Sequence, residues 1–386
     1  MLCLNLTFLE ILSVISVVSS FLTVLYVIVV VAFIKGWHKL TYFKPQKQVL
    51  TTRVSVIVAA RNEAENISKT IEDLLAQNYD KQLTELIFID DHSTDQTAAI
   101  ISSYSERGVK LIRLNEDKAL NSYKKKAIQT AIGQSAGSLI VTTDADCRMG
   151  PDWLTTIVGF YEEKNYKMIS SPVAYFEEKS FFERAQTLEF LYLIGLGAST
   201  IGNKKPSTCN GANLAYEKAA FYEVGGFKGI DDLASGDDEL LLHKMAAKYD
   251  GNIGFLKNEA AVVYTHPKAT LKEFIQQRKR WASKSTRYKN KSIIVLGVCI
   301  WLFNLSILVN LATGIFIDFY FKLALLQLLL KMTVEFLFLY DVTAFAKRQK
   351  LLVLLPVLNL LHIIYIIYIG IAGNSGKYNW KDRMVK

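Results

Sequence analysis

Long apolar stretches without a charged side chain occupy both ends of the chain, and they limit its possible folds more than any other feature. The first, Leu12–Ile34, exceeds the roughly 20 apolar residues that a helix needs to cross the hydrocarbon core of a bilayer. Two more uncharged runs, Ile293–Ile317 and Leu351–Ala372, lie near the C-terminus, and Leu323–Tyr340 between them is apolar except for one lysine and one glutamate. We therefore expect one N-terminal and about three C-terminal transmembrane helices.

Charged residues around the first run indicate its orientation. A cleaved signal peptide would begin with basic residues, whereas the only charged side chain before this run is Glu10 and no small-residue cleavage site follows. An uncleaved anchor is therefore favoured. Lysines follow at Lys35, Lys39, Lys44 and Lys47, and basic residues beside a span favour the cytoplasmic side. We expect an integral protein of the cell (inner) membrane whose central domain is cytoplasmic.

The C-terminal runs leave two alternatives open. With three spans, the basic loop 347–350 is cytoplasmic, as the charge rule prefers, but the basic tail is then outside. One segment could instead be interfacial or re-entrant. Lys331 and Glu335 are four residues apart on one helix face, so we expect a structural ion pair, with a contact to a polar substrate or a transport path as the alternative.

The chain thus divides into three expected parts. Residues 1–35 form the anchor, residues 36–292 a cytoplasmic domain, and residues 293–386 a membrane region with a tail. The net charge of +9 lies partly beside the membrane, and no aromatic-basic recognition module is apparent, so we expect membrane lipids but no nucleic acid as partners. The four cysteines show no CxxC spacing, which argues against a disulfide framework or a zinc site.

Between the membrane segments, short apolar runs alternate with longer amphipathic ones. This alternation indicates a parallel α/β sheet with helices on both faces. Capping boxes at Ser93–Gln96 and Thr270–Glu273 are each expected to open a helix. The expected strands are Val54–Ala59, Leu86–Ile89, Val109–Leu114 and Leu139–Thr142. The expected helices between them are Glu65–Gln77, Ser93 to about Glu106, and Tyr123–Gln134.

Three of the predicted strands end in acidic residues. The last one runs into Asp144 and Asp146, which project to the same side because residues two apart on a strand share a face. Glu63 follows the first strand and Asp91 the second. Ligands of parallel sheets bind beyond the carboxyl ends of the strands. Carboxylates there suit a base and ribose, or a hard cation bound together with phosphates, and a cation would offset the repulsion between the two aspartates.

Five motifs in this region resemble those of the family 2 inverting glycosyltransferases in their membrane-bound form. In chain order they are VSVIVAARNEAENI, ELIFIDDHSTDQT, LIVTTDADC, SGDDELLLHKM and QRKRW. The resemblance covers about Val54–Trp281, and the order of the motifs is more specific than the DxD pair alone. It implies a GT-A fold that binds a nucleotide diphosphate sugar, with UDP as the favoured nucleotide.

The resemblance assigns the nucleotide to the first two strand ends. Ala60 and Glu63 match positions that contact the base and ribose, and Asp91 matches a carboxylate that reads uracil. His92 stands where the family usually has glycine, so the turn at this point could differ.

The resemblance also implies residues for the metal and the diphosphate. Asp144 and Asp146 match the DxD pair, with Asp146 expected on Mg²⁺ or Mn²⁺ and Asp144 nearer the donor ribose or the outer shell of the metal. A basic residue ahead of this strand approaches the diphosphate. Lys126 is our selection, with Lys124 and Lys125 as alternatives.

The two later motifs imply a base and an acceptor site. Asp238 matches the general base and Asp237 the acid before it, although both could simply cap the next helix. Arg280 is expected on the diphosphate, while Gln277 and Trp281 are expected at the acceptor or diphosphate; a basic helix on the membrane surface is the alternative. The loop with Asn210 and Gly211 lines the sugar sites in the family, an ordinary turn being the alternative.

We therefore expect inverting, metal-dependent transfer of a sugar to a lipid or glycan acceptor at the cytoplasmic membrane face. A processive polysaccharide synthase is the alternative within this enzyme class, although three C-terminal spans are few for a channel. A noncatalytic nucleotide-binding membrane protein or transporter is the alternative of another class. It is disfavoured because inverted repeats are not evident and a binding protein would not need Asp238.

Overall fold

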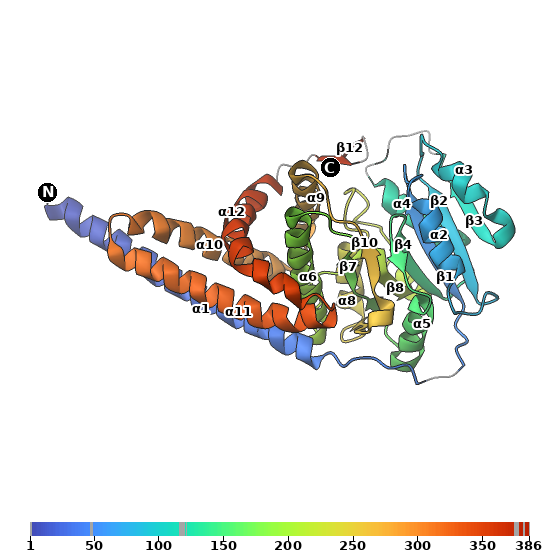
Figure 1. Cartoon of the computed structure of the whole chain (residues 1–386), viewed down its shortest axis with the longest axis horizontal. Coiled ribbons are helices and arrows are strands. Elements are labelled where there is room, and N and C mark those ends of the chain that lie inside the picture. Colours follow the sequence, from blue (N-terminus) through green and yellow to red (C-terminus); the bar gives the residue numbers. More distant parts are fainter. Residues whose placement is uncertain are drawn as a thin grey trace.

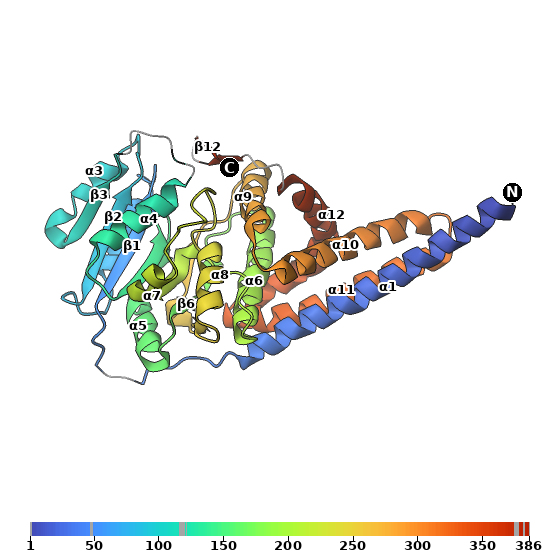
Figure 2. The same ribbon diagram turned by 180° about the vertical axis from the view of Figure 1, so that it is seen from behind.

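The computed structural model of the chain describes residues 2–46, 49–115, 120, 122–373, 378–380 and 383–385. A helical bundle projects from one side of an α/β domain (Figure 1). The bundle contains α1 (Leu2–Lys39), α10 (Lys291–Gly314) and α11 (Asp318–Phe345). The N-terminus lies at the far end of the bundle, whereas the C-terminus lies beside the α/β domain (Figures 1 and 2).

The largest sheet of the α/β domain has seven strands in the order β3-β2-β1-β4-β8-β6-β9. The four strands β3, β2, β1 and β4 are parallel, as predicted, and β8 pairs antiparallel with β4. Ala60 pairs with Asp90 and Ala59 with Asp144, so the carboxyl ends of β1, β2 and β4 meet at one edge. The strands are β1 (Val54–Ala60), β2 (Thr84–Asp90), β3 (Val109–Arg113), β4 (Leu139–Asp144), β6 (Met168–Ser170), β8 (Leu214–Glu217) and β9 (Ile253–Phe255).

Two smaller sheets complete the strands of the described residues. One has the order β5-β10-β7, with β5 (Arg148–Met149), β7 (Val173–Tyr175) and β10 (Val263–Thr265). The other, in the tail, pairs β11 (Tyr378–Trp380) with β12 (Arg383–Val385).

Helices cover both faces of the central sheet because its inner strands are apolar on both faces. On β1, Ile57 packs in the same core as α4, whereas its neighbour Val56 packs in the core formed with α2, α3 and α5. The helices of the domain are α2 (Ile67–Leu75), α3 (Thr97–Ser102), α4 (Tyr123–Gln134), α5 (Trp153–Lys164), α6 (Phe181–Gly202), α7 (Lys218–Glu223), α8 (Glu239–Lys248) and α9 (Leu271–Ser283). Short 3₁₀ helices are η1 (Ser105–Arg107), η2 (Gly211–Asn213), η3 (Glu259–Ala261), η4 (Lys284–Arg287) and η5 (Gln349–Leu354).

One of the two predicted capping boxes is wrong. The helix expected from residue 93 begins only at Thr97, because Asp95 accepts hydrogen bonds from the N–H groups of Thr97 (3.0 Å) and Ala64 (3.1 Å). These bonds tie the loop after β2 to the loop after β1. The second box is confirmed: Thr270 and Glu273 each accept from the backbone N–H of the other, and α9 begins there.

Among the described residues, four helices are long and apolar enough to cross a membrane. They are Glu10–Lys39, α10, α11 and the segment Gln349–Ala372, which contains η5 and α12 (Leu355–Ala372). The three bundle helices run alongside one another, whereas α12 curves toward α9 (Figures 1 and 2). β11 also contacts α9. The tail strands therefore lie at the same end of the bundle as the α/β domain, which fits the alternative of an interfacial or re-entrant C-terminal segment.

Several polar side chains inside the bundle bind one another across the helices. Gln327 of α11 donates to Thr23 of α1 (3.0 Å) and accepts from Asn310 of α10 (2.7 Å). The ion pair expected between Lys331 and Glu335 is present, with Nζ and Oε1 2.5 Å apart. Both side chains are almost fully buried, so the pair offsets the cost of placing charges among apolar helices.

Candidate active site

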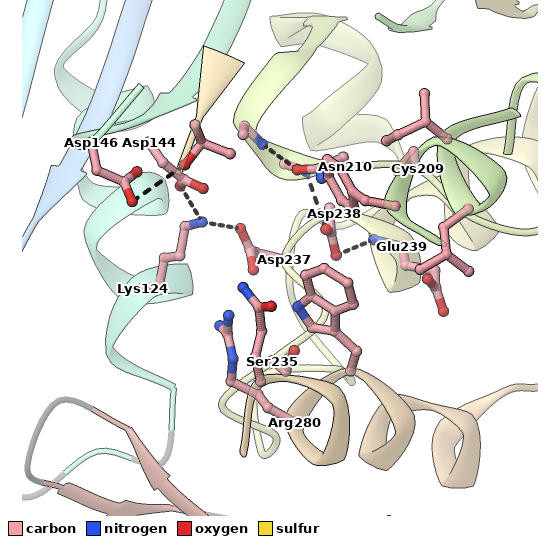
Figure 3. A pocket seen from close by; sticks show the side chains of 18 of the residues that line it. Lys124, Asp144, Asp146, Cys209, Asn210, Ser235, Asp237, Asp238, Glu239 and Arg280 are labelled. Atoms are coloured by element: carbon pink, nitrogen blue, oxygen red, sulfur yellow. Dashed lines mark hydrogen bonds and ion pairs between the residues drawn. The ribbon is translucent and has the colours of Figure 1, made fainter. Parts of the chain in front are cut away.

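A cavity of about 520 Å³ lies at the edge where the carboxyl ends of β1, β2 and β4 meet. The start of α8 and one side of α9 face that edge across the cavity (Figure 3). This is the place where open α/β sheets bind ligands. Of the residues predicted for the site, all but Lys126 line the cavity: Ala60, Glu63, Asp91, Asp144, Asp146, Asn210, Gly211, Asp237, Asp238, Gln277, Arg280 and Trp281.

The ends of β1 and β2 are held together by backbone contacts. The N–H of Asp91 donates to the carbonyl of Ala60 (2.8 Å), and Arg61 donates from Nη1 to the carbonyls of Asp91 (2.9 Å) and His92 (2.8 Å). Nearby, the N–H of Glu63 donates to the hydroxyl of Thr97 (2.8 Å). This network gives the proposed nucleotide end of the cavity a fixed backbone shape.

His92, at the position where the family usually has glycine, adopts a backbone conformation that favours glycine. Its φ is +55°, in the left-handed region, which costs a residue with a side chain about 1–2 kcal/mol relative to right-handed geometry. Its ring Nδ1 lies 3.0 Å from Oδ1 of Asp91. The departure from glycine therefore adds a side-chain contact without abolishing the turn.

Lys124 is the lysine of the KKK run that reaches the cavity. Its Nζ lies 2.7 Å from Oδ1 of Asp144 and 3.3 Å from Oδ2 of Asp237 (Figure 3). Burial opposes its charge, but these two carboxylates outweigh burial and raise the pKa of Lys124. Lys124 is therefore a cation that joins the DxD strand to the loop before α8.

Lys126, the lysine that we expected on the diphosphate, lies elsewhere. Lys126 is exposed and does not line the cavity. Lys125 does not reach the cavity either. Its buried Nζ donates to the carbonyls of Ile230, Leu233 and Ser235 at 2.6–2.7 Å. These bonds hold the loop that leads to Asp237 and Asp238. All three lysines lie in the first turn of one helix, where successive residues point about 100° apart.

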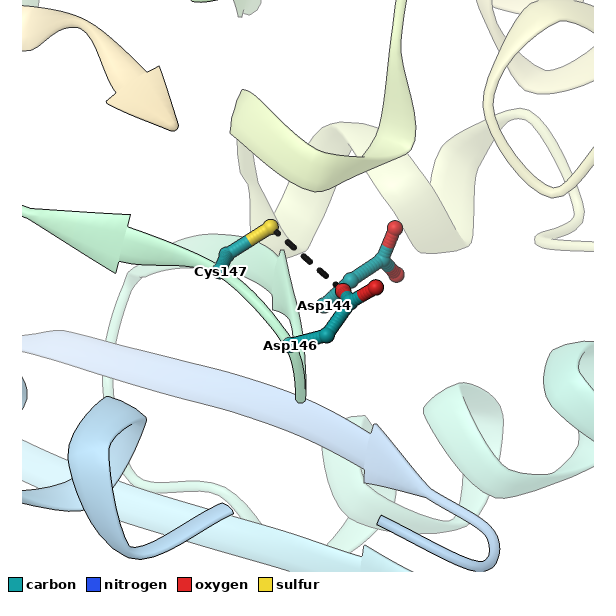
Figure 4. A group of neighbouring side chains, drawn as sticks. All are labelled: Asp144, Asp146 and Cys147. Atoms are coloured by element: carbon teal, nitrogen blue, oxygen red, sulfur yellow. Dashed lines mark hydrogen bonds between the residues drawn. The ribbon is translucent and has the colours of Figure 1, made fainter. Parts of the chain in front are cut away.

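The acids of the DxD pair form a cluster with Cys147, with one ligand atom of each within 4.8 Å of the others (Figure 4). Burial raises the pKa of the Cys147 thiol, so it remains protonated and is a poor ligand for a hard cation. Asp144 is engaged by Lys124. Among the described residues, Asp146 forms no ion pair; its nearest polar contact is the hydroxyl of Thr265 at 3.5 Å.

These observations fit a divalent cation with Asp146 as the protein ligand. Mg²⁺ and Mn²⁺ take oxygen ligands, and Mg²⁺ typically binds one or two carboxylates together with substrate phosphates. Acidic side chains also outnumber basic ones in the cavity lining, which leaves negative charge for a cation to neutralise.

Asp238 is the N-cap of α8, as the alternative interpretation allowed, and it also faces the cavity. Its Oδ1 accepts from the N–H of Glu239 (2.6 Å) and its Oδ2 from the N–H of Gly211 (3.1 Å). Burial favours the neutral acid, but Lys284, with Nζ 3.5 Å from Oδ1, and these N–H groups outweigh it, so the pKa of Asp238 is lowered. A Cβ added at Gly211 would lie 3.3 Å from Oδ2 of Asp237 and from Cβ of Asp238, so a larger residue would require these side chains to shift by a few tenths of an ångström.

Lys284 was missed by the sequence analysis. It is 6% exposed and also lies 3.3 Å from Glu239. The only sequence feature that could have identified Lys284 is its position three residues after the QRKRW motif, just past the end of α9. Several other basic residues surround it there, so the sequence does not distinguish it from them.

Residues of the QxxRW helix divide between the cavity and the core. Gln277, Arg280 and Trp281 line the cavity, whereas Arg278 is buried in an ion pair with Glu189. The guanidinium of Arg278 also lies 4.3 Å from the centre of the Trp281 ring, a cation–π contact. The buried pair therefore fixes the orientation of the tryptophan.

Asn210 has a capping role in addition to its place in the lining. Its Oδ1 accepts from the N–H of Ala212 (2.9 Å) and so caps the 3₁₀ helix η2. The turn expected as an alternative is therefore present, and it is the element that presents Gly211 to Asp238.

The central sheet and the helices that cover it form a GT-A fold. Residues 55–225 match the model of glycosyl transferase family 2. The GT-A fold predicted from the motifs is confirmed.

Similar proteins include the probable glycosyltransferase YdaM of Bacillus subtilis, 27% identical over 60% of this chain and 54% of YdaM. Another is the beta-monoglucosyldiacylglycerol synthase of Synechocystis, 26% identical over 36% of this chain and 29% of that protein. The matches thus span only about half, or less, of these relatives.

Among solved structures, the mannosyltransferase PcManGT from Pyrobaculum calidifontis in complex with GDP-Man and Mn²⁺ is similar, with a TM-score of 0.57. It is 19% identical, and the likeness covers 90% of this chain and 99% of PcManGT. At that identity the likeness concerns the fold.

Proposed function

We propose that this protein transfers a sugar from a nucleotide diphosphate sugar, with UDP as the favoured nucleotide, to a hydroxyl group of a lipid or glycan, with inversion at the anomeric carbon. One observation carries the proposal. Within a family 2 domain, the carboxylate of Asp238 and the cation of Lys124 face the same 520 Å³ cavity at the carboxyl ends of parallel strands. Glycosyl transfer requires a base at the acceptor hydroxyl and positive charge at the departing diphosphate.

The donor would lie along the strand ends. Ala60, Glu63 and Asp91 would contact the base and ribose, and Lys124 and Arg280 would face the diphosphate. Asp144 would hold Lys124 in place. Charged groups oriented before the reaction stabilise developing charge without further reorganisation, and this is commonly the largest contribution to catalysis.

Asp146 would hold a Mg²⁺ or Mn²⁺ ion, which when bound supplies positive charge to the leaving diphosphate. The relative PcManGT was solved with Mn²⁺ and GDP-Man, which supports a divalent cation in this fold without distinguishing the two metals.

The proposed step is a single displacement. Asp238 takes the proton of the acceptor hydroxyl, and the acceptor oxygen forms a bond to the anomeric carbon. The bond from that carbon to the diphosphate oxygen breaks, and its electron pair leaves with the nucleoside diphosphate. Lys124 and Arg280 stabilise the negative charge that develops there. The lowered pKa of Asp238 keeps this base deprotonated at neutral pH.

The acceptor would approach from the opposite wall, formed by Asn210, Gly211, Asp237, Gln277 and Trp281. The relative from Synechocystis is named for a lipid product, beta-monoglucosyldiacylglycerol, which supports a lipid among the acceptor classes. We place this reaction at the cytoplasmic face of the cell membrane, on the basis of the lysines that follow the first span.

The proposal is tested with the full chain purified in detergent. UDP- and GDP-linked sugars are supplied with Mn²⁺, Mg²⁺ or EDTA, and the release of nucleoside diphosphate is measured with and without membrane-extract acceptors. We expect release with at least one donor, dependence on the metal, and stimulation by acceptors. Absence of nucleotide binding across the whole panel would refute the proposed function.

A further inference from the structure

A second cavity, of about 910 Å³, lies between α1, α6, α9, α10, α11 and α12, next to the first one. Its volume is within the roughly 300–1,000 Å³ of typical ligand pockets. Its lining is largely apolar, and most of it comes from helices long enough to cross a membrane. Leu193 and Trp281 line both cavities, so the apolar cavity adjoins the candidate active site through a shared wall.

The apolar cavity also reaches the outer surface of the helices. Ile294 and Val298 of α10 and Ile371 of α12 line it, and all three are exposed, at 37%, 50% and 65%. In a membrane these residues would face lipid. A lipid could therefore enter sideways between α10 and α12 without passing through water.

The charged groups of this cavity are already neutralised. Arg278 is paired with Glu189, and the Nε of Arg278 lies 3.1 Å from Oε1 of Glu189. Glu335 is paired with Lys331 at 2.5 Å. Among the described lining residues, therefore, no carboxylate, lysine or arginine is left uncompensated. The further side chain there that can carry a positive charge is His362, so an anionic head group would meet at most one imidazole.

Asn359 contributes to the lining a buried polar atom without a partner. Asn359 of α12 is 4% exposed, and its Oδ1 has no hydrogen-bond partner among the described residues. A buried carbonyl oxygen without a donor costs about 1–3 kcal/mol. A ligand that carries an O–H or N–H group would satisfy this oxygen, whereas a plain hydrocarbon would not.

We propose that the apolar cavity binds the hydrocarbon part of the acceptor, and that the acceptor is an uncharged membrane lipid with a hydroxyl group. This inference rests on the proposed function and narrows it. The lipid head would pass Trp281 into the active-site cavity. There Asp238 needs a proton to remove, which a hydroxyl supplies and an ionised phosphate acceptor does not.

Gly297 offers a way to fill the cavity. It lines the cavity, and a Cβ added to it meets no atom within 4 Å, so Gly297→Trp can place an indole there without a backbone clash. Val295→Trp is the matched control, because Val295 lies on the same helix, is 60% exposed and does not line the cavity.

The probe is a long-chain fatty alcohol with a photoreactive group in mid-chain, offered to the full chain in detergent. We expect labelling of α10 and α12 that excess unlabelled alcohol competes away. Labelling should fall at least about tenfold in Gly297→Trp and change less than about twofold in Val295→Trp. The phosphate monoester of the same alcohol should label at least about tenfold less.

Equal labelling of Gly297→Trp and the unchanged chain, or equal labelling by the phosphate ester, would overturn the inference. A third arm compares sugar transfer to an alkyl glucoside in micelles with transfer to methyl glucoside in solution. Equal use of the two acceptors would also overturn it. Binding of the nucleotide sugar is measured separately. If the unchanged chain is labelled by the alcohol but binds no nucleotide, the proposed function fails while the lipid-binding cavity stands.

Discussion

The two neighbouring cavities both contain ion pairs, but the pairs differ in exposure. In the cavity at the strand ends, the side chains of Lys124 and Asp144 are 21% and 38% exposed. In the apolar cavity, the side chains of Arg278 and Glu189 are only 2% and 7% exposed. A partly exposed pair can exchange its partner for a ligand, whereas a fully buried pair cannot separate without leaving a charge unsolvated.

An ion pair near a site is therefore not by itself a sign of catalysis. In the proposed function, the pair of Lys124 and Asp144 meets the charges of the donor diphosphate. The pair of Arg278 and Glu189 orders the wall between the two cavities by holding Trp281. Substitutions that separate these two roles test the comparison.

The largest effect is expected from Asp238→Asn in the cavity at the strand ends. A general base contributes about 10²- to 10⁴-fold, so the turnover rate should fall by that factor. Nucleotide affinity should change less than about threefold, because the donor is held by other residues. Rates from nucleoside diphosphate release and affinities from calorimetry check this. Full activity of the variant would show that Asp238 is not the base.

A matched control for this variant lies in the same loop. Asp232→Asn removes a carboxylate that is 52% exposed and pairs with Arg287 outside the cavity. Its turnover rate should remain within about twofold of the unchanged chain.

Next in size is the cost of breaking the buried pair. Arg278→Met leaves the Glu189 carboxylate buried without its cation, which typically destabilises a protein by about 3–5 kcal/mol. Arg278→Met combined with Glu189→Leu should recover most of this loss, because no unpaired charge remains. Thermal unfolding in detergent measures both variants. If the single variant were as stable as the unchanged chain, the proposed ordering role of the buried pair would fail.

The surface pair of Arg107 and Glu72 provides the control for that experiment. It has the same chemistry, with Nη1–Oε1 at 2.6 Å, but both side chains are about half exposed. Arg107→Met should leave the unfolding midpoint close to that of the unchanged chain, because solvent replaces the lost partner.

A smaller effect is expected from Lys284→Met. Burial raises the pKa of Asp238, and the positive charge of Lys284 is the strongest of the influences that lower it. The pKa of Asp238 should therefore rise when Lys284 is replaced. The base is active only when deprotonated, and therefore the acidic limb of the rate profile should move to higher pH. A contact to a charged group contributes about 1.5–3 kcal/mol, so the acidic limb should move by about one to two pH units. The rate at neutral pH should change little, because Asp238 stays deprotonated there.

The pH profile of kcat/KM measures this shift. Arg287→Met, three residues further on and 51% exposed at the surface, is the control and should keep the profile unchanged. An acidic limb that stays in place in Lys284→Met would show that another group limits the rate at low pH.

The smallest effect is expected from His92→Gly. Glycine relieves the left-handed backbone at φ +55°, but it loses the contact to Asp91 and increases the freedom of the unfolded chain. These effects oppose each other, so the free energy of unfolding should change by less than about 1 kcal/mol. Nucleotide affinity should change less than about threefold. A loss above about tenfold would mean that the imidazole itself contacts the donor.

The sequence alone determined the long-range features of this protein. Long apolar runs, three of them uncharged and one with a single lysine and a single glutamate, predicted the four candidate spans of the described residues, because it is costly to place charge in hydrocarbon. Strands that end in acids predicted that Ala60, Asp91 and Asp144 would meet, because parallel strands bring their carboxyl ends to one edge. Both predictions rest on periodicity and length, which are local properties.

Only the tertiary structure decided which member of a local group faces the cavity. Lys124, Lys125 and Lys126 are equivalent in the sequence, but successive residues of a helix point about 100° apart. Lys124 therefore reaches the cavity, Lys125 binds the loop before α8, and Lys126 is exposed. In the same way, the packing of α12 against α9 and α10 decided that the apolar cavity exists and that the tail lies beside the α/β domain. Side-chain direction and helix packing depend on contacts between residues far apart in the chain, which no local pattern records.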